Sequence, residues 1–221
     1  MFNVLHGDCL EVMKDMTSKS VDVAFTSPPY NRKRNDKYKN YNDQIEDYFG
    51  FLCDFTDELL RICKGYVFVN VQKNYYQKKD IFKYIGKYAN KIAEIVVWEK
   101  TNPMPASGKS ITNSYEFFIC LSDKPLKSNT TYTKNIISTS VNSATTTKIH
   151  KAVMKQEVSD WFIEKFTKPE DIVIDPFMGT GTTGVSCRKL HRGFIGVGID
   201  NEYYEIAKER INTAYKENNN G

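Results

Sequence analysis

Short apolar runs alternate with stretches of helical periodicity along most of the chain. Runs rich in β-branched and aromatic residues predict strands, whereas apolar residues three and four positions apart predict amphipathic helices. The predicted strands are 21–25, 66–71, 94–98, 115–121, 172–175 and 194–199, and the predicted helices are 45–63, 78–90, 155–166, 182–190 and 203–214. This alternation favours an α/β fold with a mostly parallel central sheet and helices on both faces.

Two segments interrupt the pattern. Residues 100–114 lie between two predicted strands and contain two prolines, so a loop is expected there. In residues 128–147, eleven of twenty residues are Ser or Thr and the apolar period is lost. This second segment is expected to form a long loop or a small irregular insertion.

The length of 221 residues suits one large domain, and a 40% share of hydrophobic residues is enough for a core. No apolar run approaches the roughly 20 residues that cross a bilayer. The start, Met1–His6, lacks the basic residues and long apolar stretch of a signal peptide. We therefore expect a cytoplasmic protein without a membrane partner.

The five cysteines are widely spread and contain no C-x-x-C pair. A zinc site or a disulfide framework usually has closely spaced pairs, so neither is expected. The cysteines are interpreted as buried thiols, and no metal is predicted.

The net charge of +4 matters mainly through its distribution. Residues 31–40 hold five basic residues against one acidic residue, and residues 124–156 hold six lysines and no acid. Basic loops with interleaved Tyr and Asn suit a polyanion, although a solvated charged surface would give the same pattern. The candidate nucleic-acid contacts in the first segment are Arg32, Lys33, Arg34, Lys37 and Lys39.

A glycine-rich turn follows the predicted strand 172–175 and opens a helix. Gly179, Gly181 and Gly184 satisfy G-x-G-x-x-G, which lets the backbone approach a nucleotide-like ligand. A phosphate-binding loop would need a lysine where Val185 stands, which argues against an ATPase. A dinucleotide site, with Asp200 on the ribose, and a plain tight turn requiring positive φ are the other interpretations.

The sequence around these glycines, Asp175-Pro-Phe-x-Gly-x-Gly-Thr-Thr183, resembles the S-adenosylmethionine site of DNA amino-methyltransferases. The resemblance implies cofactor contacts from Asp175, Phe177, Gly179, Gly181 and Thr182. The acid that binds the ribose in this family usually stands where this chain has Gly198. Asp200, two residues further on the same strand face, is the expected substitute.

Thr26-Ser27-Pro28-Pro29-Tyr30 follows a predicted strand. Two prolines fix φ and remove two backbone donors, so the loop is stiff and its carbonyls are free to accept. A rigid turn with Tyr30 packed against the protein is the plainer interpretation.

The chemistry of amino methylation gives this loop a second interpretation. The amino nitrogen of cytosine or adenine is a poor nucleophile, because its lone pair is delocalised into the ring. Acceptors aimed at its N–H bonds, such as the Ser27 hydroxyl and the Pro28 carbonyl, favour the more tetrahedral nitrogen that attacks a sulfonium methyl. Tyr30 offers an aromatic face to a base flipped out of the duplex. Catalytic roles are therefore predicted for Ser27, Pro28, Pro29 and Tyr30.

The first residue of the Ser-Pro-Pro-Tyr motif indicates which base is methylated. In the family that the chain resembles, Ser-Pro-Pro-Tyr is typical of cytosine-N4 enzymes, and Asp- or Asn-Pro-Pro-Tyr of adenine-N6 enzymes. Ser27 thus favours cytosine N4 over adenine N6. Methylation at cytosine C5 needs a thiolate, usually in a Pro-Cys pair, and none of the seven prolines is followed by Cys.

Further segments resemble family elements. Asp8, in His6-Gly7-Asp8, corresponds to the Asp that meets the cofactor's adenine, with a helix N-cap as the alternative. Thr26 is assigned to the cofactor side of the catalytic loop. Residues 98–105 with 114–116 look like the block that lines the target pocket. His150 resembles a residue that covers the methionine end of the cofactor.

The order of these motifs is a catalytic half at 1–121, a variable segment at 122–149 and a cofactor half at 150–221, all within one structural domain. It is the circularly permuted order of the β group of DNA amino-methyltransferases, which have a Rossmann-like fold. The variable segment occupies the target-recognition position. The resemblance implies S-adenosylmethionine as cofactor, DNA as partner and a cognate restriction endonuclease as functional partner. The sequence leaves the oligomeric state open, with a homodimer among the options.

Other function classes can give parts of this pattern. A nucleic-acid-binding relative that has lost catalysis would explain Gly198 in place of an acid. Methyltransferases of RNA or of protein amides also use Pro-Pro-Tyr loops, but there the first residue is normally Asn. The joint occurrence of the motifs in one order favours a site-specific DNA amino-methyltransferase.

Overall fold

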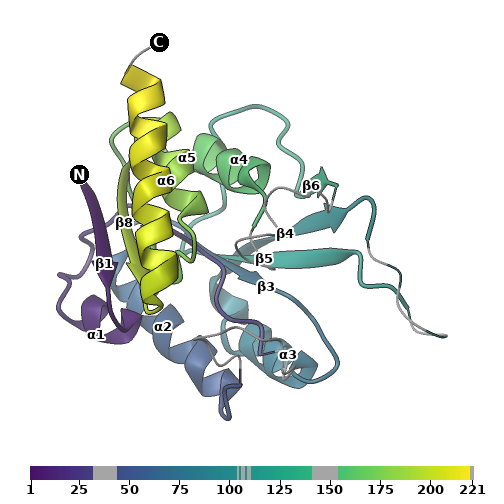
Figure 1. Cartoon of the computed structure of the whole chain (residues 1–221). Helices are drawn as coiled ribbons and strands as arrows, with labels where there is room; N and C mark the ends of the chain where they lie inside the picture. The colour runs from purple at the N-terminus through teal and green to yellow at the C-terminus, as the bar shows by residue number, and fades with distance from the viewer. Residues whose placement is uncertain (32–43, 104, 106–107, 109–110, 141–153, 220–221) are drawn as a thin grey trace.

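A computed structural model describes residues 1–31, 44–103, 105, 108, 111–140 and 154–219. The strands are β1 (Phe2–His6), β2 (Val23–Thr26), β3 (Val67–Val71), β4 (Ile92–Lys100), β5 (Tyr115–Leu121), β6 (Ile136–Thr139), β7 (Ile172–Asp175) and β8 (Gly193–Gly198). The helices are α1 (Cys9–Lys14), α2 (Tyr48–Ile62), α3 (Lys78–Lys87), the 3₁₀ turn η1 (Ala89–Lys91), α4 (Gln156–Phe166), α5 (Thr182–Lys189) and α6 (Asn201–Asn219) (Figure 1).

Within these residues the strands form one eight-stranded sheet in the order β1-β8-β7-β2-β3-β5-β4-β6. The five strands from β1 to β3 are mutually parallel, and β6 is parallel to β4. Only β5 is antiparallel to its two described neighbours, β3 and β4. The prediction of an α/β fold with a mostly parallel sheet is therefore confirmed.

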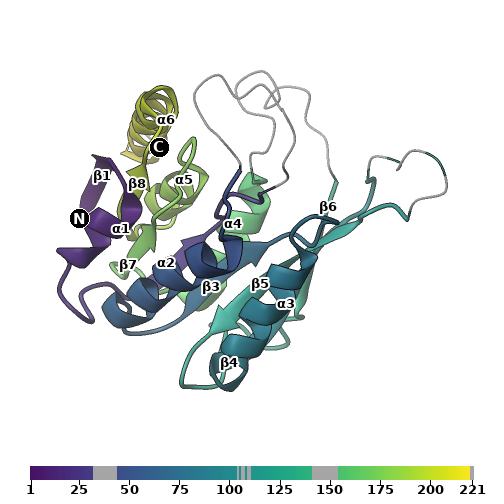
Figure 2. The ribbon, with the colours of Figure 1, turned by 90° about the horizontal axis from the view of Figure 1, so that it is seen from below.

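Helices cover both faces of this sheet (Figure 2). Successive side chains of a strand point to opposite faces, and β2 and β3 follow this rule. Ala24 and Val67 pack in one hydrophobic cluster with α1, α2 and α3. Phe25 and Phe68 pack in the other cluster with α4, α5 and α6. Strands buried on both faces explain why these runs are apolar at nearly every position.

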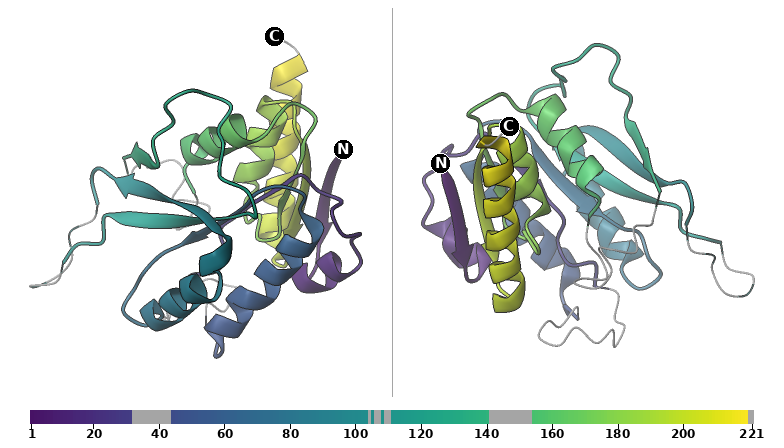
Figure 3. Two further views of the ribbon diagram at one scale, coloured as in Figure 1. Left: turned by 180° about the vertical axis from the view of Figure 1, so that it is seen from behind. Right: turned by 45° about the horizontal axis from the view of Figure 1, so that its top comes forward.

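α6 lies against β1 and β8, on the side of the molecule opposite the long strands β4 and β5 (Figure 3). The sequence pattern did not predict β1. It is an edge strand with exposed Asn3, Leu5 and His6, so its apolar alternation is weak. Its chain-neighbour α1 begins after Asp8.

The expectation of an irregular segment at 128–147 was wrong for residues 136–139. They form β6, in which Ile137 and Thr139 are buried and the alternate residues are exposed. One buried apolar side chain in a four-residue strand gives too weak a period to stand out among serines and threonines. The last seven residues of the segment lie outside the described ranges. No helix among the described residues is long and apolar enough to span a membrane.

Candidate active site

The carboxyl ends of neighbouring parallel strands gather most of the predicted site residues. Since β1, β8, β7, β2 and β3 run parallel, the segments that follow them leave the sheet at one edge. Asp8 follows β1, Asp200 follows β8, the glycine turn follows β7 and Ser27 follows β2. Ligands of open α/β sheets bind at this edge. β5 is antiparallel, so its beginning, with Glu116, reaches the same edge.

Hydrogen bonds fix the backbone of the Ser-Pro-Pro-Tyr loop. The Tyr48 hydroxyl donates to the carbonyl of Pro29 at 2.7 Å. The Asn74 side-chain amide donates to the carbonyl of Tyr30 at 3.2 Å. These contacts come from α2 and from the segment after β3, so elements on two sides hold the loop. The loop is therefore supported beyond the stiffness that its two prolines supply.

The Ser27 hydroxyl is oriented by a buried amide. It donates to Oδ1 of Asn70 at 3.0 Å and lies 3.0 Å from the Tyr30 hydroxyl. Asn70 has no exposed surface, and its own amide donates to the carbonyl of Phe117 at 3.2 Å, which fixes which of its atoms faces Ser27. A hydroxyl that has donated its one hydrogen keeps lone pairs for accepting. Ser27 is thus prepared to act as an acceptor.

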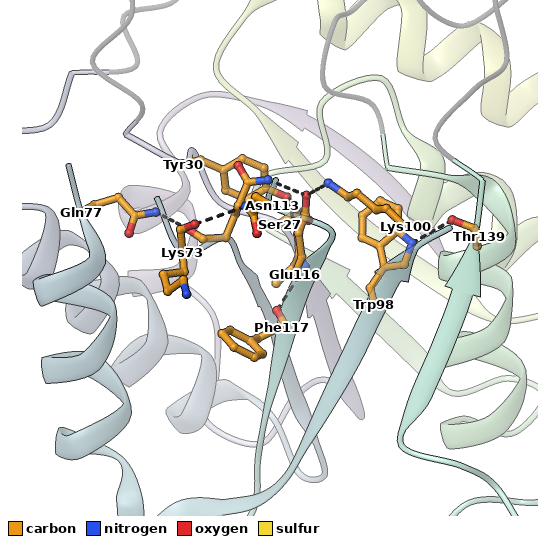
Figure 4. Close-up of polar contacts among 12 residues, drawn as sticks. Ser27, Tyr30, Lys73, Gln77, Trp98, Lys100, Asn113, Glu116, Phe117 and Thr139 are labelled. Carbon is orange, nitrogen blue, oxygen red and sulfur yellow. Dashed lines mark hydrogen bonds and ion pairs between the residues drawn. The ribbon is translucent and has the colours of Figure 1, made fainter. Parts of the chain in front are cut away.

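Glu116 joins the catalytic loop to β4 (Figure 4). Its carboxylate is 2% exposed and accepts from the Tyr30 hydroxyl at 2.9 Å and from the Gln72 amide at 3.2 Å. Lys100 forms an ion pair with the same carboxylate, and its ammonium lies 5.1 Å from the centroid of the Trp98 ring. A buried charge needs partners of this kind, because transfer from water is costly.

Glu116 and Lys100, both in the block 98–105 with 114–116, therefore lie beside the catalytic loop. The Trp98 indole in turn donates to the Thr139 hydroxyl at 2.9 Å, which ties β6 to the same network. The predicted variable segment thus contributes a residue next to this network. Its proposed role in target recognition stays a prediction.

The glycine turn has the geometry that glycine permits. Gly179 has φ of 48° and Gly181 has φ of 81°, both in the left-handed region. A Cβ on Gly179 would meet no atom within 4 Å, so open space adjoins the turn on this side. A Cβ on Gly184 would come within 2.4 Å of Ile211, because α5 packs closely on α6. The turn thus combines a backbone accessible to a ligand with a tight helix contact.

Asp175 links the two halves of the site. The Thr26 hydroxyl donates to Oδ1 at 2.7 Å and the Thr183 hydroxyl to Oδ2 at 2.6 Å. The backbone N–H of Phe177 also donates to Oδ1, at 3.1 Å. Burial raises the pKa of the Asp175 carboxyl from 3.8 to about 6, and these three hydrogen bonds oppose the rise. Thr26, itself fully buried, supports the site through this contact.

The two acids proposed for the adenosine part lie beyond neighbouring strands. Asp8 is the N-cap of α1 and accepts from the N–H groups of Leu10 at 2.8 Å and Glu11 at 3.3 Å. Asp8 therefore does cap α1, which was the alternative role expected for it, and Oδ1 is the acceptor. The prediction that Asp200 continues the face of β8 was wrong, since β8 ends at Gly198. Asp200 instead accepts from the N–H of Tyr203 at 2.9 Å at the start of α6.

Gly198 is the position of the missing acid. It pairs with His6 of β1, and its carbonyl accepts from the N–H of Gly7 at 3.1 Å, so it lies close to Asp8. A Cβ at Gly198 would lie 3.0 Å from the terminal methyl of Met178. Asp8, Gly198 and Asp200 thus belong to one corner of the sheet edge.

Two further predicted cofactor residues also contact the protein. Phe177 is half-buried, and its ring lies 5.6 Å from that of Phe51 and 5.0 Å from that of Phe55, on α2. Thr182 is buried at the start of α5, and its carbonyl accepts from the amide of Gln156. These contacts position the turn between helices on the two faces of the sheet.

The basic candidates Arg32, Lys33, Arg34, Lys37 and Lys39 lie outside the described residues, as does His150. The residues that bound the basic segment are described. The Asn31 amide donates to the carbonyl of Ile45 at 2.8 Å, and its oxygen accepts from the Ile45 N–H at 3.1 Å. Asn31 and Ile45, the described residues on either side of the basic segment, are therefore held together next to Tyr30.

Sequence reasoning missed three supporting residues, Asn70, Gln72 and Thr183. Asn70 had a detectable signal, since it is the one polar residue in the otherwise apolar run 66–71. Gln72 follows that run directly, and Thr183 lies inside the recognised glycine motif. Gln72 bonds to Glu116, 44 residues away, so only the strand order brings that pair together, whereas Thr183 bonds to Asp175 within the motif itself.

All five cysteines are free and buried, as expected. Within the described parts of the chain, no group of three His, Cys, Asp or Glu side chains could hold a metal ion. The residues that could hold a cofactor are those around the glycine turn and at the ends of β1 and β8.

Comparison with known proteins gives a family match, described as DNA methylase, over residues 21–209. The Type II methyltransferase M.HinfI of Haemophilus influenzae is 26% identical over 245 residues, covering 94% of this chain and 67% of the relative. The Type II methyltransferase M.MwoI of Methanothermobacter wolfeii is 31% identical over 206 residues. That match covers 85% of this chain, but the chain spans only 30% of the length of M.MwoI.

Solved structures share the fold. The cytosine-N4-specific PvuII DNA methyltransferase superposes with a TM-score of 0.74 at 21% identity, covering 98% of this chain and 92% of that chain. The structure of M1.HpyAVI in complex with S-adenosylmethionine gives a TM-score of 0.67 at 25% identity, covering 96% of this chain and all of the other.

Proposed function

The chain belongs to the DNA methylase family, and on that premise we propose that it transfers a methyl group from S-adenosylmethionine to an exocyclic amino nitrogen of a flipped DNA base. The observation that carries this proposal is the Ser27 hydroxyl, which donates to Asn70 and so presents its oxygen as an acceptor. An amino group that is to receive a methyl group needs a hydrogen-bond acceptor of this kind at its N–H bonds.

The residues at the sheet edge fit S-adenosylmethionine. When bound, this cofactor supplies a methyl group on a sulfonium sulfur. Open space beside Gly179 admits a ligand against the backbone of the turn, and Asp8 and Asp200 offer carboxylate oxygens at the corner near Gly198. Asp8 would hold the adenine amino group, Asp200 a ribose hydroxyl, and the turn from Asp175 to Thr182 the methionine part of the cofactor.

In this proposal, the catalytic loop prepares the amino nitrogen for attack. Ser27 Oγ and the Pro28 carbonyl accept from its two N–H groups, which localises the lone pair on nitrogen. Tyr30 packs its ring against the base, while Glu116 and Asn74 hold Tyr30 in place. With the cofactor bound, the nitrogen held in this way would take the methyl group from the sulfonium sulfur, which would keep the electron pair of the broken S–CH₃ bond, and the nitrogen would then release one proton to solvent.

We propose cytosine N4 as the methylated atom, with adenine N6 as the alternative. The support is the serine at the first position of the Ser-Pro-Pro-Tyr motif, which is typical of cytosine-N4 enzymes. Nucleoside mass spectrometry of DNA treated with the protein distinguishes the two outcomes. N4-methylcytosine is expected, and N6-methyladenine alone would replace this assignment with the alternative.

The basic segment is proposed to bind the DNA backbone. Asn31, which follows Tyr30, is bonded to Ile45, and the sequence between them contains Arg32, Lys33, Arg34, Lys37 and Lys39. Phosphate contacts of this kind make binding salt-sensitive. Since M.HinfI and M.MwoI are Type II methyltransferases, we also propose a restriction endonuclease as the functional partner.

Transfer of label from tritiated S-adenosylmethionine to unmethylated plasmid DNA tests the proposed function. The purified protein is expected to label DNA, and RNA or protein added instead should stay unlabelled. Cofactor and DNA binding without transfer would favour an inactive nucleic-acid-binding relative. Absence of both transfer and cofactor binding would refute the proposal.

A further inference from the structure

Two large aromatic side chains are exposed to solvent in a segment that contacts the catalytic loop. Tyr75 is 79% exposed and Tyr76 is 61% exposed, in the segment between β3 and α3. Their rings contact each other edge to face, with centroids 5.5 Å apart. They belong to neither hydrophobic cluster. An exposed aromatic pair at the edge of a candidate active site indicates a contact surface.

The backbone of this segment is tied to the catalytic loop. The Asn74 amide donates to the carbonyl of Tyr30 at 3.2 Å, and its oxygen accepts from the N–H groups of Tyr76 at 2.9 Å and Gln77 at 3.2 Å. One side chain thus fixes both the turn that carries the tyrosines and the loop that carries Tyr30.

A second set of contacts holds the start of the segment from the other side. The Asn113 amide donates to the carbonyl of Lys73 at 3.3 Å, and the Gln77 amide donates to the carbonyl of Gln72 (Figure 4). The tyrosines therefore stand on a supported turn at a fixed place relative to the catalytic loop. Because the turn is already held in place, a partner that binds the tyrosines pays little entropy for ordering protein residues.

The charges around Tyr75 and Tyr76 indicate the chemistry of the partner that they bind. Residues 72–79 contain Lys73, Lys78 and Lys79 and no acid. The ammonium of Lys78 lies 5.1 Å from the centroid of the Tyr75 ring. Aromatic faces interleaved with lysines match a ligand that combines flat rings with phosphates, namely nucleic acid. A self-association surface would have no need of this charge.

We propose that Tyr75 and Tyr76 contact the DNA duplex beside the extruded target base and stack on the bases that extrusion leaves exposed. The inference rests on the proposed function, because only a base taken out of the duplex leaves its neighbours without a stacking partner. The lysines contact the flanking phosphates. Base–aromatic stacking of this kind makes the pair a determinant of duplex binding.

Paired variants of the full chain test this assignment. Y75A/Y76A removes both rings, Y75F/Y76F keeps them, and F82A removes another exposed aromatic ring, on α3. Methyl transfer to native unmethylated phage DNA is measured for each, together with DNA affinity over a range of salt concentrations. Circular dichroism and binding of S-adenosylmethionine check that the fold and the cofactor site are intact.

Y75A/Y76A is expected to lose at least about 10-fold in kcat/KM and in DNA affinity, with the salt slope unchanged because the lysines remain. Y75F/Y76F and F82A should stay within about two-fold of the wild type. A wild-type rate for Y75A/Y76A, or a change in its oligomeric state, would overturn this inference alone. A wild type that transfers no methyl group would overturn the proposed function and this inference with it.

Discussion

The Thr26 hydroxyl donates to the Asp175 carboxylate at 2.7 Å, although 149 residues separate the two in sequence. Thr26 ends β2 and Asp175 ends β7, and these strands are parallel neighbours at the centre of the sheet. The contact therefore joins the base-binding half of the candidate site to the cofactor half. In a chain with the permuted motif order, a link of this kind fixes the position of one half relative to the other.

Replacement of Asp175 by Asn should change how stability depends on pH. Burial raises the pKa of this carboxyl to about 6, so the folded chain holds the proton more tightly than the unfolded chain does. Ionisation thus costs stability as pH rises from about 4 to above 6, by about 3 kcal/mol in full. Relative to wild type, D175N should become more stable by about that amount over this range.

Urea unfolding of both proteins at several pH values between 4.5 and 7.5 measures the difference. Asn cannot accept from both Thr26 and Thr183 as the carboxylate does, and that loss is independent of pH. A stability difference between D175N and wild type that is constant across the range would contradict the role of burial at this carboxyl.

Ser27→Ala should lower turnover far more than DNA affinity. In the proposed mechanism, the contact from the Ser27 oxygen to the amino group strengthens as the nitrogen becomes tetrahedral, so it should act chiefly in the transition state. A loss of about 100-fold in kcat is expected by analogy with other preorganised polar contacts. Single-turnover transfer and DNA binding are measured side by side, and equal turnover in S27A would refute the role of Ser27.

The sequence predicted the inner part of this fold well, because strands buried on both faces give continuous apolar runs. Residues 115–121 were predicted with the bounds that β5 has, and β7 at 172–175 likewise. The sequence pattern failed to predict the two outermost strands of the sheet. β1 and β6 each have a solvent side, and their short alternation is lost among polar neighbours.

The site shows the same division. Ser27, Tyr30 and Asp175 could be identified, because their motifs are local in sequence. The contacts that orient these residues could not be predicted, since Asn70 and Glu116 reach the loop only through the positions of β3 and β5. The predicted direction of Asp200 failed because β8 ends at Gly198, one residue before the end of the predicted strand and two residues before Asp200.

Gly184→Ala tests the packing of α5 on α6. A methyl group there would meet the Ile211 side chain at 2.4 Å and the Phe194 ring at 2.8 Å, and both of these side chains are buried and would have to shift. A loss of about 1–3 kcal/mol in the free energy of unfolding is expected from overpacking. Gly86→Ala on α3 is the control, because its Cβ meets nothing within 4 Å. That change should gain up to about 1 kcal/mol from helix propensity, and equal effects in the two variants would refute the argument.

Asp200→Asn tests the carboxylate proposed to bind the ribose. Asn caps helices about as well as Asp, so the contact to the Tyr203 N–H and the thermal midpoint should persist. The charged acceptor is lost, and affinity for S-adenosylmethionine, measured by calorimetry, should fall about 10-fold. The second change Gly198→Asp places a carboxylate at the family's usual position. There its Cβ would lie 3.0 Å from the flexible end of Met178, which can move aside. D200N/G198D should therefore recover most of the affinity, and wild-type affinity in D200N alone would show that Asp200 serves only as the cap of α6.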